Sequence, residues 1–302
     1  MKNLPFIQTS VFVEDRYPFG GNQLATFWDA GCNRELSSDT MQGIAREMNF
    51  SETTFLEKPT VKGCVSKVRI FTPNKELKFA GHPTLGTSFV MKQKGIVTAS
   101  QNSAIVELGI GPIHIEFQPD DHVKMTQPSP TFMDTVKDLS LVTEAINLET
   151  NDVSDKYPAQ IVSTGLPFLI LPLKSLSAVK KANPSPQLIL KSLKKLPTAQ
   201  LLIFSSETIH SENDVHVRMF APGVGVLEDP ATGSAAGPLG AYLERYEILK
   251  RHTFGEPIQI EQGYEIERPS RLTVTVPHES MEEVFVAGKV RLVAEGTFYA
   301  PM

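Results

Sequence analysis

The chain has 302 residues, of which 41% are hydrophobic, and it carries a formal net charge of −5. This length favours two domains or one large α/β unit, because single cores rarely exceed about 100–200 residues. The acidic balance and the absence of a dense Lys/Arg cluster argue against a nucleic-acid partner. No apolar run reaches the ~18 residues of a membrane span, and the start lacks signal-peptide features, so we expect a cytoplasmic protein that binds no membrane.

Short alternating or β-branched runs bounded by Pro, Gly and Asn/Asp predict strands along the whole chain. In chain order they cover residues 6–15, 65–73, 103–117, 159–173, 199–206, 214–222, 270–277 and 283–296. Helical patterns cover residues 37–50, 83–95, 185–197 and 232–250, the first with a Ser/Asp start typical of an N-cap. This balance predicts a β-rich α+β protein rather than regular βαβ alternation.

The chain also contains an internal repeat. VRIFTP at Val68–Pro73 returns as VRMFAP at Val217–Pro222, and HPTLGTS at His82–Ser88 matches DPATGSA at Asp229–Ala235. A weaker echo relates FGGNQLATF to STGLPFLIL, in the same order along the chain. Order and spacing favour a duplicated domain over chance similarity of strand-and-turn sequences.

The repeat predicts two domains, one over residues 1–120 and one over residues 121–289. The turn-rich segment PDDHVKMTQPSP separates them. Residues 290–302 can return to the first domain, and the placement of the last strand, EGTFYAPM, is left open by the sequence.

Each copy of the repeat leads from a strand through a Pro turn into a helix with small residues in its first turn. His82 and Asp229 are expected at or just before these two helix starts, where free N–H groups and the helix dipole suit an anion such as a carboxylate. Asp229 alone is more simply explained as an N-cap. His82 has the alternative of a buried histidine with a backbone partner, although it alone among the seven histidines lies in the repeated motif.

Glu52 is a second acidic candidate because of its surroundings. In EMNFSETTFLE it follows a helix and is flanked by Ser51, Thr53 and the apolar Phe50 and Phe55. Apolar surroundings favour the neutral form of a carboxyl group, which makes it useful for general acid/base catalysis near neutral pH. An exposed Glu at a strand edge is the equally weighted alternative.

Four motifs together resemble one known family. They are NFSETTF around Glu52, AGHPTLGT at Ala80–Thr87, GVGVLEDPATGSAAG at Gly223–Gly237 and FGGNQLA at Phe19–Ala25. They are similar to those of the PhzF family of phenazine-biosynthesis-like isomerases, and the resemblance spans essentially the whole chain. It implies the diaminopimelate-epimerase-like fold, with two pseudo-symmetric domains, each a β-barrel-like sheet around a central helix, and an active site between them.

The resemblance also implies roles for single residues. The residue matching Glu52 is the acid/base in the isomerisation of trans-2,3-dihydro-3-hydroxyanthranilate. The residues that match the substrate-binding positions are His82, Asp229 and Ser234, with backbone groups of Gly81 and Gly233. A small carboxylic acid as substrate, no metal or organic cofactor and a homodimer are further expectations from this resemblance.

Other chemistries fit the sequence less well. Epimerases of the same fold use two cysteines, but the corresponding positions are Ala80 and Thr232, and Cys32 and Cys64 both lie in the first half of the chain. The two cysteines form no CxxC or Cys/His pattern, so no zinc site is expected. The short GIG and GVG runs do not continue to GxGxxG, which disfavours a nucleotide-binding oxidoreductase. A non-catalytic binding protein that kept the cleft is the remaining alternative.

Overall fold

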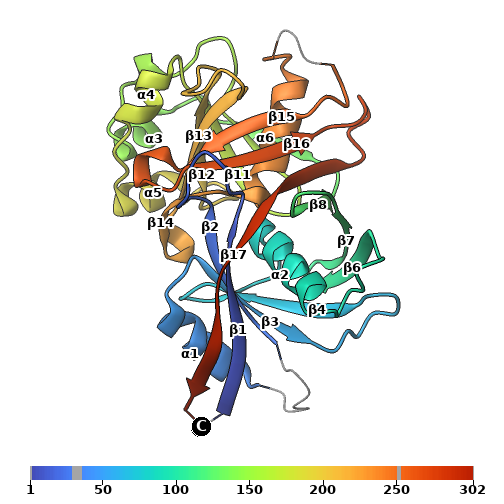
Figure 1. Ribbon diagram of the computed structural model, residues 1–302. Coiled ribbons are helices and arrows are strands. Elements are labelled where there is room, and N and C mark those ends of the chain that lie inside the picture. Colours follow the sequence, from blue (N-terminus) through green and yellow to red (C-terminus); the bar gives the residue numbers. More distant parts are fainter. Residues whose placement is uncertain (1, 29–35, 250–252, 302) are drawn as a thin grey trace. The chain divides into compact units, whose positions relative to one another are not determined.

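The structure is a computed structural model that describes residues 2–28, 36–249 and 253–301 (Figure 1). It divides into two compact units. Unit 1 comprises Met1–Thr126 and Ala287–Met302, and unit 2 comprises Gln127–Val286. Helices and strands mix in both units, so the predicted α+β class is confirmed. Among the described residues, every helix is too short or too polar to span a bilayer.

The described part of unit 1 contains two helices within a mainly antiparallel set of strands. Its elements are β1 (Lys2–Val11), β2 (Asn22–Phe27), α1 (Ser38–Met48), β3 (Glu52–Glu57), β4 (Ser66–Phe71), β5 (Glu76–Leu77), α2 (Gly81–Gln93), β6 (Ser103–Leu108), β7 (Gly111–Phe117), β8 (His122–Gln127) and most of β17 (Val284–Ala300). From Val290 onwards, β17 runs antiparallel to β1, ending with the pair Lys2 and Ala300.

The segment PDDHVKMTQPSP is more than the turn that the sequence suggested. Asp120 and Asp121 form a turn with positive φ angles of 55° and 60°, and β8 then begins at His122. Buried and half-buried residues alternate along β8, as they do in a strand with one covered face. The turn residues are thus present at Asp120 and Asp121, and β8 was not predicted, because Val123 and Met125 are only two apolar positions among polar neighbours.

Outside residues 250–252, unit 2 is built from strands, four α-helices and short 3₁₀ turns. Its elements are β9 (Thr131–Thr135), α3 (Ser140–Ala145), β10 (Gln160–Ser163), β11 (Pro167–Pro172), α4 (Leu176–Lys181), α5 (Pro186–Leu193), β12 (Leu201–Ser205), β13 (Val215–Ala221), β14 (Val226–Asp229), α6 (Gly233–Arg245), β15 (Ile258–Gln262) and β16 (Ser270–Thr275). Three 3₁₀ turns cover Thr150–Asp152, Pro222–Val224 and Tyr264–Ile266.

The two units repeat one pattern of strand pairing. In unit 1 the successive pairs β1–β2, β2–β3, β3–β4, β4–β6 and β6–β7 are antiparallel, parallel, antiparallel, parallel and antiparallel. In unit 2 the pairs β10–β11, β11–β12, β12–β13, β13–β15 and β15–β16 follow the same order of directions. The repeated VRIFTP and VRMFAP motifs begin on β4 and β13, so the sequence repeat corresponds to a repeat of structure.

One buried helix lies within the strands of each unit. The first eleven residues of α2 are buried, and α2 contacts β1, β2, β3, β4 and β7. The first eleven residues of α6 are also buried, and α6 contacts β10, β11 and β16. A helix that is apolar or small on all sides is suited to such a position. At Gly86 of α2 a Cβ atom would lie 2.6 Å from Leu24 Cδ2, so only glycine allows this close packing on β2.

Each unit also anchors the loop before its β4 or β13 strand through a glutamate. Glu107 on β6 accepts hydrogen bonds from the backbone N–H groups of Thr60 and Val61. Glu261 on β15 accepts corresponding bonds from the N–H groups of Ile209 and His210. Both glutamates sit on the strand that runs parallel to the strand after the loop, so they are equivalent positions of the structural repeat.

Candidate active site

The end of α1 places Glu52 at the start of a buried strand. The Ser37 side chain caps α1 at Thr40 N, and Asn49 ends the helix in the left-handed region with φ 53°. Glu52 is then the first residue of β3 and lies opposite Leu24 of the parallel strand β2. Only 9% of Glu52 is exposed, so the alternative of an exposed strand-edge glutamate is wrong.

His82 lies beside Glu52. It is the second residue of α2, it is 3% exposed, and its Nε2 is 3.4 Å from Glu52 Oε2. Complete burial lowers the pKa of His82 to about 3, because an imidazolium would lose its hydration there. The backbone of Gln23 opposes this effect only in part. The imidazole is therefore neutral near pH 7, and a neutral ring lies beside the carboxyl group of Glu52.

Asn22 contacts the ring of His82. Its side-chain amide nitrogen is 3.0 Å from His82 Nδ1. The ring nitrogen that faces Glu52 is Nε2, at 3.4 Å from Oε2. Because the ring is neutral, it borders the carboxyl group without adding a second full charge.

The start of α2 has an uncapped first turn, as the sequence suggested, but His82 lies within this turn. The helix begins at Gly81, and its N-cap residue, Ala80, has no side chain that bonds to the first turn. The first N–H groups thus lack the usual side-chain cap, which suits an anion. His82 is inside the helix rather than before it, and Pro83 occupies the third position, where a missing N–H costs no intrahelical bond.

Asp229 and the start of α6 differ from the expected helix cap. Asp229 is the last residue of β14 and is 5% exposed, whereas Thr232 is the N-cap and the helix begins at Gly233. The N-cap interpretation of Asp229 is therefore wrong, because Pro230 and Ala231 separate it from the cap. Its Oδ2 instead accepts a 2.6 Å hydrogen bond from the Thr232 hydroxyl.

Ser234 and Gly233 occupy the first turn of α6. Ser234 is buried, and the carbonyl of Gly233 accepts a 2.9 Å hydrogen bond from the Gln127 side chain. Gln127 in turn accepts a bond from the Thr164 hydroxyl. Unit 1 thus brings Glu52, His82 and Gly81 to one helix start, and unit 2 brings Asp229, Gly233 and Ser234 to the equivalent one.

Sequence reasoning missed the amide side chains around these groups. Asn22 contacts His82, and Gln127 donates a hydrogen bond to the carbonyl of Gly233. Gln262 bonds to the segment between Asp229 and α6. A glutamine at a strand end has no periodicity or charge that would mark it. Asn22 did have a signal, since it lies in the FGGNQLA motif.

A separate buried cluster in unit 2 is built around His216. This histidine on β13 is fully buried, with Nδ1 2.7 Å from Glu261 Oε1 and Nε2 2.9 Å from Glu265 Oε1. Burial alone would lower the pKa of His216, but the hydrogen bonds to both glutamates outweigh it and raise the pKa. Burial alone would raise the pKa of Glu261 and of Glu265, but hydrogen bonds, first among them the bond from His216, outweigh it and lower both pKa values. This cluster connects β13 with β15 and with the 3₁₀ turn at Tyr264–Ile266, which is a structural role.

Cys64 in unit 1 carries a free thiol. Burial raises the pKa of the Cys64 thiol, and nearby Glu107 adds to this, so Cys64 is a poor nucleophile. Cys32 lies outside the described residues.

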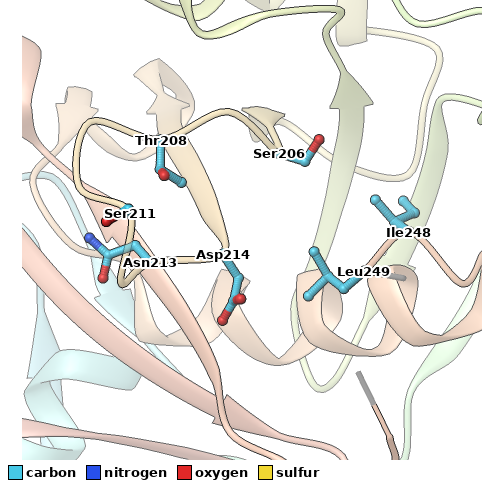
Figure 2. A pocket seen from close by; sticks show the side chains of 7 residues that line it. All are labelled: Ser206, Thr208, Ser211, Asn213, Asp214, Ile248 and Leu249. Carbon is cyan, nitrogen blue, oxygen red and sulfur yellow. The ribbon is translucent and has the colours of Figure 1, made fainter. Parts of the chain in front are cut away.

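A cavity of about 400 Å³ in unit 2 is lined by hydroxyl and carboxylate side chains such as Ser206 and Asp214 and by Ile248 (Figure 2). None of the six predicted site residues lines it, so the candidate site rests on the two helix starts.

Comparisons with known proteins identify the family of this chain. Residues 10–296 match the family model described as phenazine biosynthesis-like protein. The trans-2,3-dihydro-3-hydroxyanthranilate isomerase of Pseudomonas aeruginosa is 35% identical over 287 residues, covering 93% of this chain and 95% of that protein. An uncharacterised isomerase of Bacillus subtilis, YfhB, is 33% identical over 243 residues, covering 80% of this chain and 81% of that protein.

Solved structures show the same relationship. The PhzF-family phenazine biosynthesis protein of Bacillus anthracis superposes with a TM-score of 0.87 at 29% identity, covering 99% of this chain and 100% of the other. A hydroxyproline epimerase of Agrobacterium vitis shares the fold alone, with a TM-score of 0.66 at 9% identity over 98% of this chain and 92% of the other. The chain therefore belongs to the phenazine biosynthesis-like, or PhzF, family and is an isomerase of that family.

Proposed function

We propose that the protein isomerises a small carboxylic acid similar to dihydro-hydroxyanthranilate by proton transfer through Glu52. The observation that carries this proposal is the buried Glu52 carboxyl group 3.4 Å from the neutral ring of His82. The 35% identity to a trans-2,3-dihydro-3-hydroxyanthranilate isomerase supports the substrate class. A carboxylic acid of this kind has a carbon next to an unsaturated system, where a carboxylate base can remove a proton.

In the proposed reaction, the Glu52 carboxylate takes a proton from the activated carbon and returns it at another carbon of the same substrate. The neutral ring of His82 lies beside this carboxyl group and can orient the substrate. The electron pair released from the C–H bond moves into the unsaturated system, and no redox change occurs. The net result is a shifted double bond and no lost atom.

The remaining predicted residues are proposed to bind the substrate. The N–H groups at Gly81 and Gly233 belong to helix starts without a side-chain cap, which suits a carboxylate. Asp229 and Ser234 can bind its amine or hydroxyl groups. A homodimeric cytoplasmic enzyme that needs no cofactor remains a prediction from the family resemblance, and light scattering of the purified chain tests the dimer.

The test replaces Glu52 by glutamine, which keeps the shape and removes the base. Trans-2,3-dihydro-3-hydroxyanthranilate is incubated with wild type and E52Q in D₂O, and double-bond migration and deuterium incorporation are followed by NMR. We expect a loss of about 100-fold or more in rate, as is typical for a general acid/base. Glu57→Gln is the matched control, because Glu57 lies on the same strand and forms ion pairs with Lys67 and Arg69.

Two results would contradict the proposal. Activity of E52Q equal to that of wild type would remove Glu52 from the reaction. Binding of the acid by the wild type without deuterium exchange or isomerisation would favour the non-catalytic alternative for this substrate.

A further inference from the structure

Gln262 makes all its side-chain hydrogen bonds to the segment that links β14 to α6. It is the last residue of β15 and is 2% exposed. Its amide nitrogen donates to the carbonyl of Asp229 at 2.7 Å and to the hydroxyl of Thr232 at 3.0 Å. Its amide oxygen accepts from the backbone N–H of Thr232 at 3.1 Å. One side chain thus connects both ends of the segment before the helix.

The direction of each bond is fixed by chemistry. A backbone carbonyl can only accept and a backbone N–H can only donate, so the amide of Gln262 has a single possible orientation. The Thr232 oxygen accepts from Gln262, and its own proton is donated to the Asp229 carboxylate at 2.6 Å. The bonds therefore run in one chain from Gln262 through Thr232 to Asp229, and each strengthens the next.

Two further features characterise the segment between β14 and α6. Thr232 is the N-cap of α6, yet its side chain makes no capping bond, since the hydroxyl is used for Asp229. Gly263, next to Gln262, has φ +83°, and a Cβ there would lie 2.5 Å from the carbonyl oxygen of Pro230. Only glycine allows this close approach of the two backbones.

We propose that Gln262 is a positioning residue of the active site, which orients the Asp229 carboxylate for substrate binding by way of Thr232. The role of Asp229 in binding rests on the proposed function. The orienting role of Gln262 and Thr232 rests on their hydrogen bonds to Asp229 and to each other. A carboxylate displaced by about 1 Å can cost an enzyme about 100-fold in rate.

The first experiment compares kcat/KM of variants with trans-2,3-dihydro-3-hydroxyanthranilate. We expect Q262L and T232V each to lose about 100-fold, T232S to retain activity within about 3-fold, and the double variant Q262L/T232V to lose no more than either single variant. Gln160→Leu is the matched control, because Gln160 is a buried glutamine of the same unit. It has bonds to the Met133 carbonyl and the Tyr246 hydroxyl, and we expect Q160L to stay within about 2-fold of wild type.

The second experiment needs no substrate. Amide hydrogen exchange at Thr232 is measured in wild type, Q262L and Q160L. The N–H of Thr232 loses its acceptor in Q262L, so we expect its exchange to accelerate at least about 10-fold there and to remain unchanged in Q160L. If Q262L does not fold, T232V and T232S provide the comparison of activities.

The two experiments separate the two proposals. Wild type without isomerase activity would overturn the proposed function, and the exchange of Thr232 would then still judge the role of Gln262. Unchanged exchange in Q262L, wild-type kcat/KM in folded Q262L, or an equal loss in Q262L and Q160L would overturn the positioning role. Equal losses in T232S and T232V would overturn the route through the Thr232 hydroxyl.

Discussion

The cluster around His216 predicts a large and pH-dependent contribution to the stability of unit 2. Replacing His216 by glutamine removes the positive charge between Glu261 and Glu265 but keeps an amide that can donate a hydrogen bond. Both glutamates are largely buried, at 0% and 13% side-chain exposure, so they cannot turn to water in place of the lost partner. The variant leaves two carboxylates beside a neutral group.

The expected cost follows from the contacts that remain. Removing one partner of a buried ion pair destabilises a protein by about 3–5 kcal/mol. Glu261 keeps donors from Ile209, His210 and Asn213, so we expect the lower end, about 3 kcal/mol. With a urea slope of about 2 kcal/mol/M, the unfolding midpoint should fall by roughly 1.5 M.

The pH dependence has a defined sign. The pKa of His216 is raised above its ordinary 6.5 in the folded state, so its contribution is complete below pH 6.5 and lost as the pH rises through the raised value. The pKa values of Glu261 and Glu265 are lowered below 4.5, so their contribution is complete above pH 4.5 and lost as the pH falls through the lowered values. The difference between wild type and H216Q should therefore be largest at about pH 4.5–6.5.

The assay is urea unfolding of the full chain at pH 5.5, 7 and 9, with two spectroscopic signals. Trp28, the one tryptophan of the sequence, reports on unit 1, and near-ultraviolet absorbance of the tyrosines reports mainly on unit 2. Only the second transition should shift in H216Q. His278→Gln, at an exposed histidine of the same unit, is the control and should change nothing. A difference below about 1 kcal/mol at pH 5.5, or one that grows towards pH 9, would refute the reasoning.

Two further predictions concern residues of the helices α1, α2 and α6. Gly240→Ala should destabilise unit 2 by about 1–3 kcal/mol, because the new Cβ would lie 2.6 Å from Val274 Cγ2. Gly43→Ala in α1 should stabilise the protein by up to about 1 kcal/mol, because a Cβ there meets no atom within 4 Å. Thermal unfolding measures both effects. The His82 imidazole should stay neutral between pH 5 and 8 in nitrogen-15 NMR spectra. Because its pKa falls from 6.5 to about 3 on folding, unit 1 should lose stability as the pH falls from 6.5 towards 3. A His82 signal that titrates near pH 6.5 would contradict that assignment.

Much of the fold could be predicted from the sequence because its hydrophobic patterns are local. The predicted helices at residues 37–50, 83–95, 185–197 and 232–250 correspond to α1, α2, α5 and α6, with ends that differ by several residues. The short α3 and α4 were missed, since six residues cannot establish a helical period. Strand β8 was missed because its outward face carries His, Lys and Thr and resembles a loop.

The candidate site was less accessible to sequence reasoning. The repeat and the family resemblance identified Glu52, His82 and Asp229, and the burial of all three fits a site. The burial of Glu52 itself could not be predicted, since it depends on β2 and α2 covering the start of β3. The chain of bonds from Gln262 to Asp229 joins residues 33 positions apart, and no local pattern encodes such a contact.

The paired glutamates Glu107 and Glu261 have a consequence for how the two halves of this chain could diverge. Each holds the loop before its strand by a few backbone N–H groups, and backbone groups are present whatever the loop sequence. Loop residues beyond the anchored ones are thus free to change in length and composition while the strand register is kept. In unit 2 the anchoring carboxylate lies opposite His216, whereas in unit 1 the equivalent position is Lys67, so equivalent attachment points carry a titratable buried cluster in one half and a lysine in the other.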